Sequence, residues 1–559
     1  RGRRIPLPTY PWQRSRHWFA PSIPDEVLFH EVRWDPLESP SGEGMARGLW
    51  LLLGEGLPGL EQALRSRGAS ARRRPHGSPF PEVQVDHVVF LAEGREVKDL
   101  TRAFLSAAQD CVQKGVGSLW LVTRGAQGPD PGEEGPWQAP LWGLARTVAI
   151  EHPEIGCRRV DLDPAGSDDL EYLLATLLDP AGEDEFRLRG GQRAASRLVP
   201  VEIPPATPFH PGQDGTWLLT GGTGGLGLGL AGWLVERGVR HLVLISRRGA
   251  DTTQHRQAIK ALQNQGARVR VACLDVADRP ALARLLEEIQ SQDPPLRGVF
   301  HLAGSFEPTL LADEGPEGLA RTMGAKVQGA WNLHELTAGM ELEHFVFYSS
   351  VAATLSSPGQ GAYAAANAFL DALACWRRAR GLPATALAWT AFRDAGMAVG
   401  QEDRLGRLEA SGMGTLRQEQ GLALLDDLLA SSPAHLCVLP LDLPRWLEYY
   451  PQWETSSLLA RPRPQTADAE ALPDLVASCL ARVLGCPLHQ VDRDRPFLEQ
   501  GVDSLRAVEL RNLLQRRIRR ALPVTVAFEH PTVLSLAAHL AGSTPLRKLS
   551  PSLPAPAGP

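Results

Sequence analysis

The chain has 559 residues, of which 43% are hydrophobic and 22% are charged, and its formal net charge is -6 at pH 7. This length is too great for one hydrophobic core, so we expect several compact units, and the composition excludes a wholly disordered or fibrous protein. The small net charge excludes a basic field for nucleic acid, and no apolar stretch is long enough to span a membrane. Seven scattered cysteines favour neither disulfides nor a metal site, and we expect a cytoplasmic protein.

The chain up to residue 450 is expected to be mostly α/β. Residues 1–24 have an extended, proline-pinned pattern, and we expect a linker within a fragment of a longer protein. Residues 25–207 alternate short apolar runs with helical patterns, which is typical of a parallel sheet. The alternation is stronger in residues 208–450. Its predicted strands are 217–220, 242–245, 269–272, 298–301, 345–347 and 384–388. Two tandem α/β units are therefore expected, and we assign a glycine-rich phosphate turn only to the second.

The remaining residues have a different pattern. We expect a linker at 451–470, a small helical bundle at 471–542 and a flexible tail at 543–559. The bundle is predicted from three amphipathic runs that carry no strand pattern. These runs are 472–484, 505–518 and 533–540.

A glycine-rich turn follows the strand at 217–220 and precedes a helical pattern. The turn consists of Gly221, Gly222, Thr223, Gly224, Gly225, Leu226 and Gly227. Glycines let backbone N–H groups approach a pyrophosphate at a helix N-terminus, although such a cluster alone is often only a tight turn.

The next two strands supply context for that turn. Ser246 and Arg247 follow the second strand, where an enzyme that prefers NAD usually carries an acidic residue, so we expect NADPH. Either of the arginines at 247 and 248 could instead be a solvated surface charge. Asp275 and Val276 follow the third strand and are candidates to contact the adenine, although Asp275 could equally be a helix N-cap.

A proton donor for ketone reduction is predicted near residue 360. Ser350 ends a strand, and Tyr363 and Asn367 lie one turn apart on the following helix, so they share a face. A phenol with an ordinary pKa near 10 needs a nearby ammonium to donate its proton at neutral pH. Taken singly, Tyr363 could be a packed helix residue and Ser350 a strand cap, so the prediction depends on the spacing.

Residues 216–400 resemble the ketoreductase of modular type I polyketide synthases, within the short-chain dehydrogenase/reductase superfamily. The matching motifs are 220–227, 246–249, 301–304, 326–330, 363–367 and 389–397. In these ketoreductases the lysine comes from a preceding helix and asparagine follows the tyrosine by four residues, as Lys326 and Asn367 do here.

The resemblance implies a role for each of these residues. Tyr363 would donate the proton, Ser350 would bind the carbonyl, Lys326 would lower the tyrosine pKa, and Asn367 would support the proton relay. Ala303 and Gly304, in the motif at 301–304, would contact the cofactor.

The resemblance also implies the architecture and the reaction. We expect two tandem Rossmann-like, doubly wound parallel-sheet subdomains, the first truncated and cofactor-free and the second NADPH-binding, followed by a helical carrier. The substrate would be a β-ketoacyl thioester. The chain departs from the family where product stereochemistry is read, because Phe306-Glu307-Pro308 replaces one signature and Leu355 the other. The hydroxyl configuration therefore stays open.

The segment around Ser504 is similar to the acyl carrier protein motif, in which the serine receives 4′-phosphopantetheine. Gly501 breaks the incoming loop, and Asp503 can cap the helix that Ser504 begins, where a phosphodiester is favoured. An ordinary N-cap is the alternative. The resemblance implies a phosphopantetheinyl transferase, a ketosynthase and an acyltransferase as partners. A free-standing reductase and a non-catalytic scaffold are the rival interpretations.

Overall fold

The computed structural model divides the chain into two compact units, Arg1–Arg461 and Pro462–Pro559. It describes residues 28–38, 44–166, 169–180, 182–204, 209, 211, 214–450, 453, 456–459, 471–484, 486–502, 506–507, 510–511, 514, 522 and 526–542. The expected segments 1–24 and 543–559, as well as Asp503 and Ser504, lie outside these residues. Each unit is described by itself.

The first unit contains two lobes. The first lobe, within 28–204, contains β1 (Phe29–Leu37), β2 (Leu49–Leu53), α1 (Leu60–Ser66), β3 (Ser70–Arg74), β4 (His87–Leu91), α2 (Val97–Lys114), β5 (Ser118–Arg124), α3 (Gly135–Glu151), β6 (Arg158–Leu162), α4 (Asp169–Leu178), β7 (Glu185–Arg189) and β8 (Gln192–Pro200). The second lobe, within 214–450, contains β9 (Thr216–Thr220), α5 (Gly225–Glu236), β10 (His241–Ser246), α6 (Thr253–Asn264), β11 (Arg268–Cys273), α7 (Arg279–Gln292), β12 (Leu296–His301), α8 (Pro316–Met323), a π-helix (Gly324–Gly329), α9 (Ala330–Thr337), β13 (His344–Ser350), α10 (Gly361–Arg378), β14 (Thr385–Trp389), α11 (Glu402–Ala410), α12 (Gln418–Ser431), β15 (His435–Val438) and α13 (Leu443–Tyr449).

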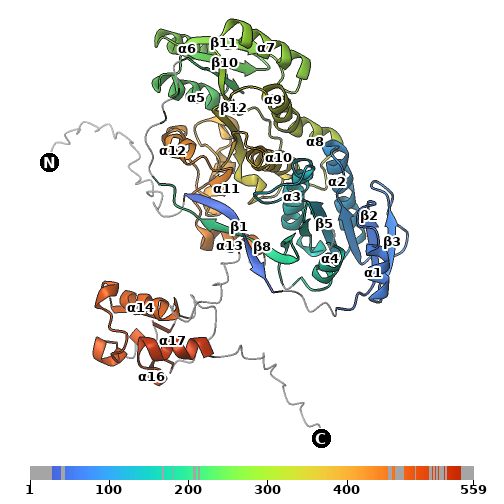
Figure 1. The fold of residues 1–559 in the computed structure, drawn as a ribbon, viewed down its shortest axis with the longest axis vertical. Helices are drawn as coiled ribbons and strands as arrows, with labels where there is room; N and C mark the ends of the chain where they lie inside the picture. Colours follow the sequence, from blue (N-terminus) through green and yellow to red (C-terminus); the bar gives the residue numbers. More distant parts are fainter. Residues whose placement is uncertain are drawn as a thin grey trace, which may run out of the picture. The chain divides into compact units, whose positions relative to one another are not determined.

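The described strands of both lobes form one 15-stranded sheet (Figure 1). Its order is β11-β10-β9-β12-β13-β14-β15-β1-β8-β7-β6-β5-β4-β2-β3. The second lobe is parallel and has the strand order of a dinucleotide-binding fold, which confirms the predicted α/β class. The two predicted units are joined, because β1 pairs antiparallel with both β15 and β8.

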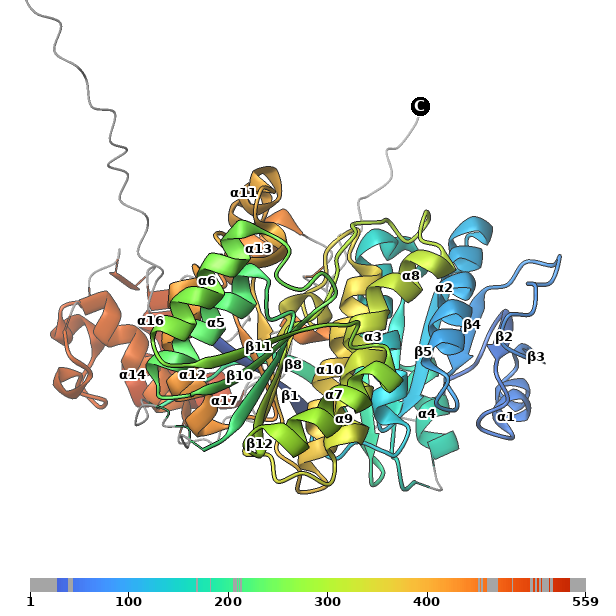
Figure 2. The same ribbon diagram turned by 90° about the horizontal axis from the view of Figure 1, so that it is seen from above.

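Helices cover both faces of the sheet, and one layer is continuous across the two lobes. Buried side chains of α2, α3, α7, α9 and α10 form a single core cluster on one face, where these helices lie side by side (Figure 2). The opposite face is covered by α5, α6 and α12 in the second lobe and by α1 and α4 in the first. The lobes therefore share a core as well as a sheet.

The lobes also approach each other closely between α3 and α10. A Cβ atom on Gly143 would lie 2.4 Å from the carbonyl oxygen of Ala364, so only glycine allows the two helix backbones to come this close. Ala364 directly follows Tyr363. The first lobe therefore packs against the turn of helix that carries the predicted proton donor.

The first lobe also contains a glycine pattern that the sequence analysis missed. A Gly-x-Gly-x-x-Gly pattern at residues 54–59 lies between β2 and α1. Arg73 donates to three backbone carbonyls of this turn, and a Cβ atom on Gly56 would lie 2.5 Å from a carboxylate oxygen of Glu93. The expectation that this lobe lacks any such turn is therefore wrong, although the lobe's own side chains occupy it.

The second unit is helical over its described residues, as predicted. It contains α14 (Ala471–Leu484), α16 (Val526–Glu529) and α17 (Val533–Gly542). Its core is formed by buried apolar side chains that include Val476, Leu480, Phe497, Leu510 and Leu536. The predicted run 505–518 lies largely outside the described residues. Among the described residues of either unit, no helix is long and apolar enough to cross a membrane.

Candidate active site

The glycine turn of the second lobe connects β9 to α5 and borders a cleft of about 710 Å³. A Cβ atom on Gly227 would lie 2.4 Å from the carbonyl oxygen of Gly221, and one on Gly222 would lie 2.8 Å from that of Leu219. Both contacts are with backbone, so side chains cannot be accommodated there. Because α5 begins at Gly225 and faces this cleft, its N-terminal N–H groups suit a pyrophosphate.

The two arginines that follow β10 are both exposed and both line the cleft. Ser246 is the last residue of β10, and Arg247 comes next. The Arg248 side chain is 83% exposed and forms an ion pair with Asp251 at 3.8 Å. The interpretation as a solvated surface charge therefore stays open for both arginines, and Ser246 and Arg247 present a hydroxyl and a guanidinium to the cleft.

The adenine-side candidates follow β11 and line the same cleft. Asp275 accepts a hydrogen bond from the backbone N–H of Ala277 at 2.9 Å, and the N-cap of α7 is Asp278. The alternative that Asp275 caps a helix is therefore wrong. Val276 is buried, and a Cβ atom on Gly329 would lie 2.5 Å from its side chain.

Three distant segments meet at the end of β13. Ser350 is the last residue of β13 and lies close enough to Tyr363 of α10 to lower the pKa of its phenol. The Lys326 Nζ atom lies 5.8 Å from the Tyr363 ring centroid and donates to the carbonyl of Tyr348 at 2.8 Å. Asn367 donates to the backbone carbonyl of Tyr363 at 2.8 Å, and its buried Oδ1 has no hydrogen-bond partner among the described residues.

Lys326 belongs to the π-helix between α8 and α9. Such π-turns within longer helices occur frequently at functional sites. The lysine stem needs space beside the end of β12, and a Cβ atom on Gly304 would lie 2.7 Å from Lys326 Cε. Glycine at 304 therefore lets the ammonium reach the site. Ala303 and Gly304 both line the cleft beside the glycine turn, and their contact with a cofactor stays a prediction.

Burial dominates the electrostatics of the site. It raises the pKa of Tyr363, which the hydrogen bond to Ser350, the charge of Arg404 and the hydrogen bond to Asn367 lower in part. Burial also lowers the pKa of Lys326 to about 8, against the attraction of Asp371.

Two side chains next to Tyr363 were not among the predicted site residues. A pocket of about 110 Å³ is lined by Ser350, Tyr363, Lys326, Phe306 and Arg404 among others. The Phe306 ring meets the Tyr363 ring edge to face at 5.1 Å, and the Arg404 guanidinium lies 4.0 Å from the Phe306 centroid. Position 306 stood out only as a departure from the family, and no sequence signal marks Arg404 on the polar helix α11.

The fold and this site define a dinucleotide-dependent reductase of the short-chain type, followed by a helical unit. Family models match the KR domain at residues 215–394, the Rossmann fold domain of the polyketide synthase extender module SpnB at 32–198, and the phosphopantetheine attachment site at 474–540.

Known proteins agree with these matches. The chain is 34% identical to pikromycin polyketide synthase component PikAIII of Streptomyces venezuelae over 99% of the chain and 38% of that protein. It is 35% identical to erythronolide synthase EryA3 of Saccharopolyspora erythraea over 98% of the chain and 18% of that protein. The chain thus spans well under half of these relatives.

Solved structures match the reductase unit. The A-type ketoreductases from a modular polyketide synthase share 32% identity with it at a TM-score of 0.71, over 78% of this chain and 97% of theirs. A C2-type ketoreductase shares 28% identity at a TM-score of 0.68, over 78% and 99%. The chain belongs to the ketoreductases of modular polyketide synthases.

The described neighbours of Ser504 agree with the predicted loop. Gly501 has a left-handed backbone with φ of 95°, as a residue that breaks the incoming segment requires. Arg506 donates to its carbonyl at 2.7 Å, and Phe497 is buried in the core of the second unit. Ser504 itself stays a predicted attachment site.

Proposed function

We propose that this chain reduces a β-ketoacyl thioester to a β-hydroxyacyl thioester with NADPH, and that the acyl chain is held on 4′-phosphopantetheine at Ser504. The observation that carries the proposal is the convergence of Ser350, Tyr363 and Lys326 beside a glycine turn that borders a large cleft. The combination of a reductase and a carrier-type unit in one chain favours a tethered substrate over a free one.

The residues around the cleft suit NADPH. The glycine turn and the N-terminus of α5 would hold the pyrophosphate, and Ser246 with Arg247 would bind the 2′-phosphate. Asp275 and Val276 would lie against the adenine, and Ala303 and Gly304 would border the nucleotide further along the cleft. When bound, NADPH supplies the hydride that reaches the carbonyl carbon.

The chain's own residues handle the oxygen of the ketone. Ser350 donates a hydrogen bond to the carbonyl oxygen and orients it toward Tyr363, whose hydroxyl then gives its proton to that oxygen. The raised pKa of Tyr363 keeps the phenol protonated before hydride arrives. The Lys326 ammonium stabilises the phenolate left behind, and Asn367 supports the return of a proton.

Loss of the proton donor tests the proposal. We expect Tyr363→Phe to lower NADPH oxidation with a β-ketoacyl N-acetylcysteamine thioester by more than about 100-fold, while NADPH binding stays intact. A non-catalytic scaffold would show no turnover in the unsubstituted protein. Turnover that persists in the variant would reject Tyr363 as the donor.

The carrier assignment has a separate test. Incubation with coenzyme A and a phosphopantetheinyl transferase should add one phosphopantetheine mass, and Ser504→Ala should abolish the gain. A free-standing reductase would show no mass gain. The relatives are multidomain polyketide synthases, so we expect ketosynthase and acyltransferase domains as further partners.

A further inference from the structure

A short segment at the C-terminal end of the first unit is buried inside it. Residues 456–459, which we call the C-terminal strap, lie within the expected linker 451–470 and beyond α13. Ser457 is 1% exposed and Leu458 is fully buried. A segment that only connected two units would remain at the surface, so this burial requires another explanation.

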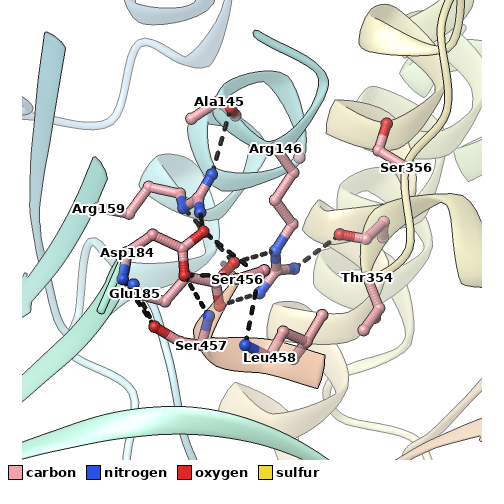
Figure 3. Close-up of polar contacts among 12 residues, drawn as sticks. Ala145, Arg146, Arg159, Asp184, Glu185, Thr354, Ser356, Ser456, Ser457 and Leu458 are labelled. Atoms are coloured by element: carbon pink, nitrogen blue, oxygen red, sulfur yellow. Dashed lines mark hydrogen bonds and ion pairs between the residues drawn. The ribbon is translucent and has the colours of Figure 1, made fainter. Parts of the chain in front are cut away.

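The strap is bound to the first lobe through polar contacts at the start of β7 (Figure 3). The Ser457 backbone N–H donates to Asp184 at 2.6 Å, and the Ser457 hydroxyl accepts from the backbone N–H groups of Asp184 and Glu185 at 2.7 and 3.2 Å. Arg197 donates to the Ser457 carbonyl at 3.0 Å. The strap therefore fixes the backbone that carries Glu185.

Glu185 in turn holds an arginine from α3. Its carboxylate accepts two hydrogen bonds from Arg146, at 2.7 and 2.8 Å, in the paired geometry that only a guanidinium provides. Although burial alone would raise the pKa of Glu185, Arg146 and Arg159 lower it to about 2. The pair is thus charged and almost completely buried.

The remaining guanidinium nitrogen of Arg146 contacts the second lobe. Its Nη1 atom donates to the carbonyl of Ala353 at 2.7 Å, and in Figure 3 its guanidinium lies between Glu185 and the loop that continues to Thr354. Ala353 ends the 3-10 turn that begins directly after Ser350. The Ser350 hydroxyl accepts from the backbone N–H of Ala352 at 3.3 Å, so the same turn sets the orientation of that hydroxyl.

We propose that Arg146 is a positioning residue of the reductase, which fixes the turn behind Ser350, and that the C-terminal strap holds Arg146 in place through Glu185. This inference rests on the proposed function, because it assigns Ser350 a role in orienting the ketone. The lobe without a cofactor site thereby contributes to catalysis, and so does the segment that leads toward the carrier.

The test compares two buried arginines. Arg146→Lys keeps a positive charge but cannot bind Glu185 in the paired manner and reach Ala353 as well. Arg193→Lys is the matched control, because Arg193 is as buried as Arg146 and donates to the backbone carbonyls of Asp179 and Glu38, which lie in neither the strap nor the turn behind Ser350. We expect Arg146→Lys to lower kcat about 10- to 100-fold, with KM and the NADPH Kd within about threefold, since small misplacements of reacting groups have effects of this size.

The control should separate positioning from stability. Arg193→Lys should also lower Tm but leave kcat of the folded protein within about twofold. Equal losses of kcat in both variants, or an unchanged kcat in Arg146→Lys, would overturn the inference. If Arg146→Lys does not fold, Ser457→Ala serves instead and should lower kcat by about threefold or more with the NADPH Kd unchanged.

The outcome for the proposed function stays distinguishable. Unsubstituted full-length protein that fails to oxidise NADPH with the β-ketoacyl thioester would reject the function itself. Active unsubstituted protein together with unaffected Arg146→Lys and Ser457→Ala variants would reject only the positioning role.

Discussion

Each lobe has a glycine-rich turn that connects a strand to the following helix, but the surroundings of the two turns differ. In the second lobe the turn after β9 borders the open cleft and leads into the 12-residue helix α5. In the first lobe the turn after β2 leads into the 7-residue helix α1. Arg73 donates a hydrogen bond to each of three backbone carbonyls of this turn. Glycine spacing therefore specifies the curvature of the backbone, and the neighbouring side chains decide whether a ligand has room.

The charged neighbours of the two turns can also be compared. Beside the first turn, Glu93 supplies a carboxylate that would lie 2.5 Å from a Cβ atom on Gly56. Beside the second turn, the cleft lining includes the hydroxyl of Ser246 and the guanidinium of Arg247, as well as carboxylates such as that of Asp275. A carboxylate is thus present at both turns, and the second turn differs in having a guanidinium and the N-terminus of a 12-residue helix beside an open cleft.

The largest expected effect comes from adding a side chain to each turn. Gly227→Val would place atoms against the backbone of Gly221, so the turn must open. If two of its backbone N–H groups then lose their charge-assisted hydrogen bonds to the pyrophosphate, we expect NADPH binding to weaken by more than about 100-fold. Gly56→Ala would meet only the movable end of Glu93, and the NADPH Kd should stay within about twofold. Fluorescence titration measures both. Similar weakening in both variants would contradict the comparison.

This comparison also shows what the sequence could predict. The turn at 221–227, its flanking strands, and the shared helical face of Tyr363 and Asn367 depend on spacing within one or two elements, so the sequence predicts them. The joining of the lobes could not be predicted, because β1 carries charged residues such as Glu31 and Arg33 and pairs with strands far away in the chain.

The missed site residues share a physical reason. Arg404 contacts Phe306 only because α11 folds over the pocket, and Arg146 reaches Ala353 across 207 positions of sequence. Neither helix carries a spacing pattern that points to these contacts. Local patterns therefore predict the catalytic group and the turn, whereas tertiary contacts determine the walls and supports around them.

A moderate effect is expected from changing the cation beside the second turn. Arg247→Glu would place a carboxylate near the 2′-phosphate, and we expect the preference for NADPH over NADH, measured as the ratio of kcat/KM, to fall about 10- to 100-fold. Arg248→Glu is the control, because that side chain is largely exposed and pairs with Asp251. An equal fall in both variants would show that overall charge, and not position 247, sets the preference.

A smaller effect concerns the ammonium near the second turn. Burial lowers the pKa of Lys326 from 10.5 to about 8, so we expect kcat to fall about fivefold between pH 8 and pH 9. The effect of pH on stability has the opposite sign to its effect on kcat. Between about pH 8 and 10.5 the unfolded chain binds more protons at this lysine, so this group raises the free energy of unfolding as pH rises. A parallel loss of kcat and Tm would therefore reject Lys326 as the cause.

The smallest expected effect is that of Glu93→Gln at the first turn. Burial raises the pKa of Glu93 despite the attraction of His76 and Arg73, so its surroundings disfavour the charge slightly. The amide keeps the size and an acceptor oxygen of the carboxylate, and because the side chain is largely exposed we expect Tm to change by less than about 2 °C at pH 7. Because its pKa is raised in the folded protein, the ionised Glu93 destabilises the fold only at pH values where the carboxyl loses its proton. Any gain in Tm from Glu93→Gln should therefore vanish toward pH 4. The NADPH Kd should not change. A marked loss of Tm would instead show that the charged carboxylate stabilises this turn.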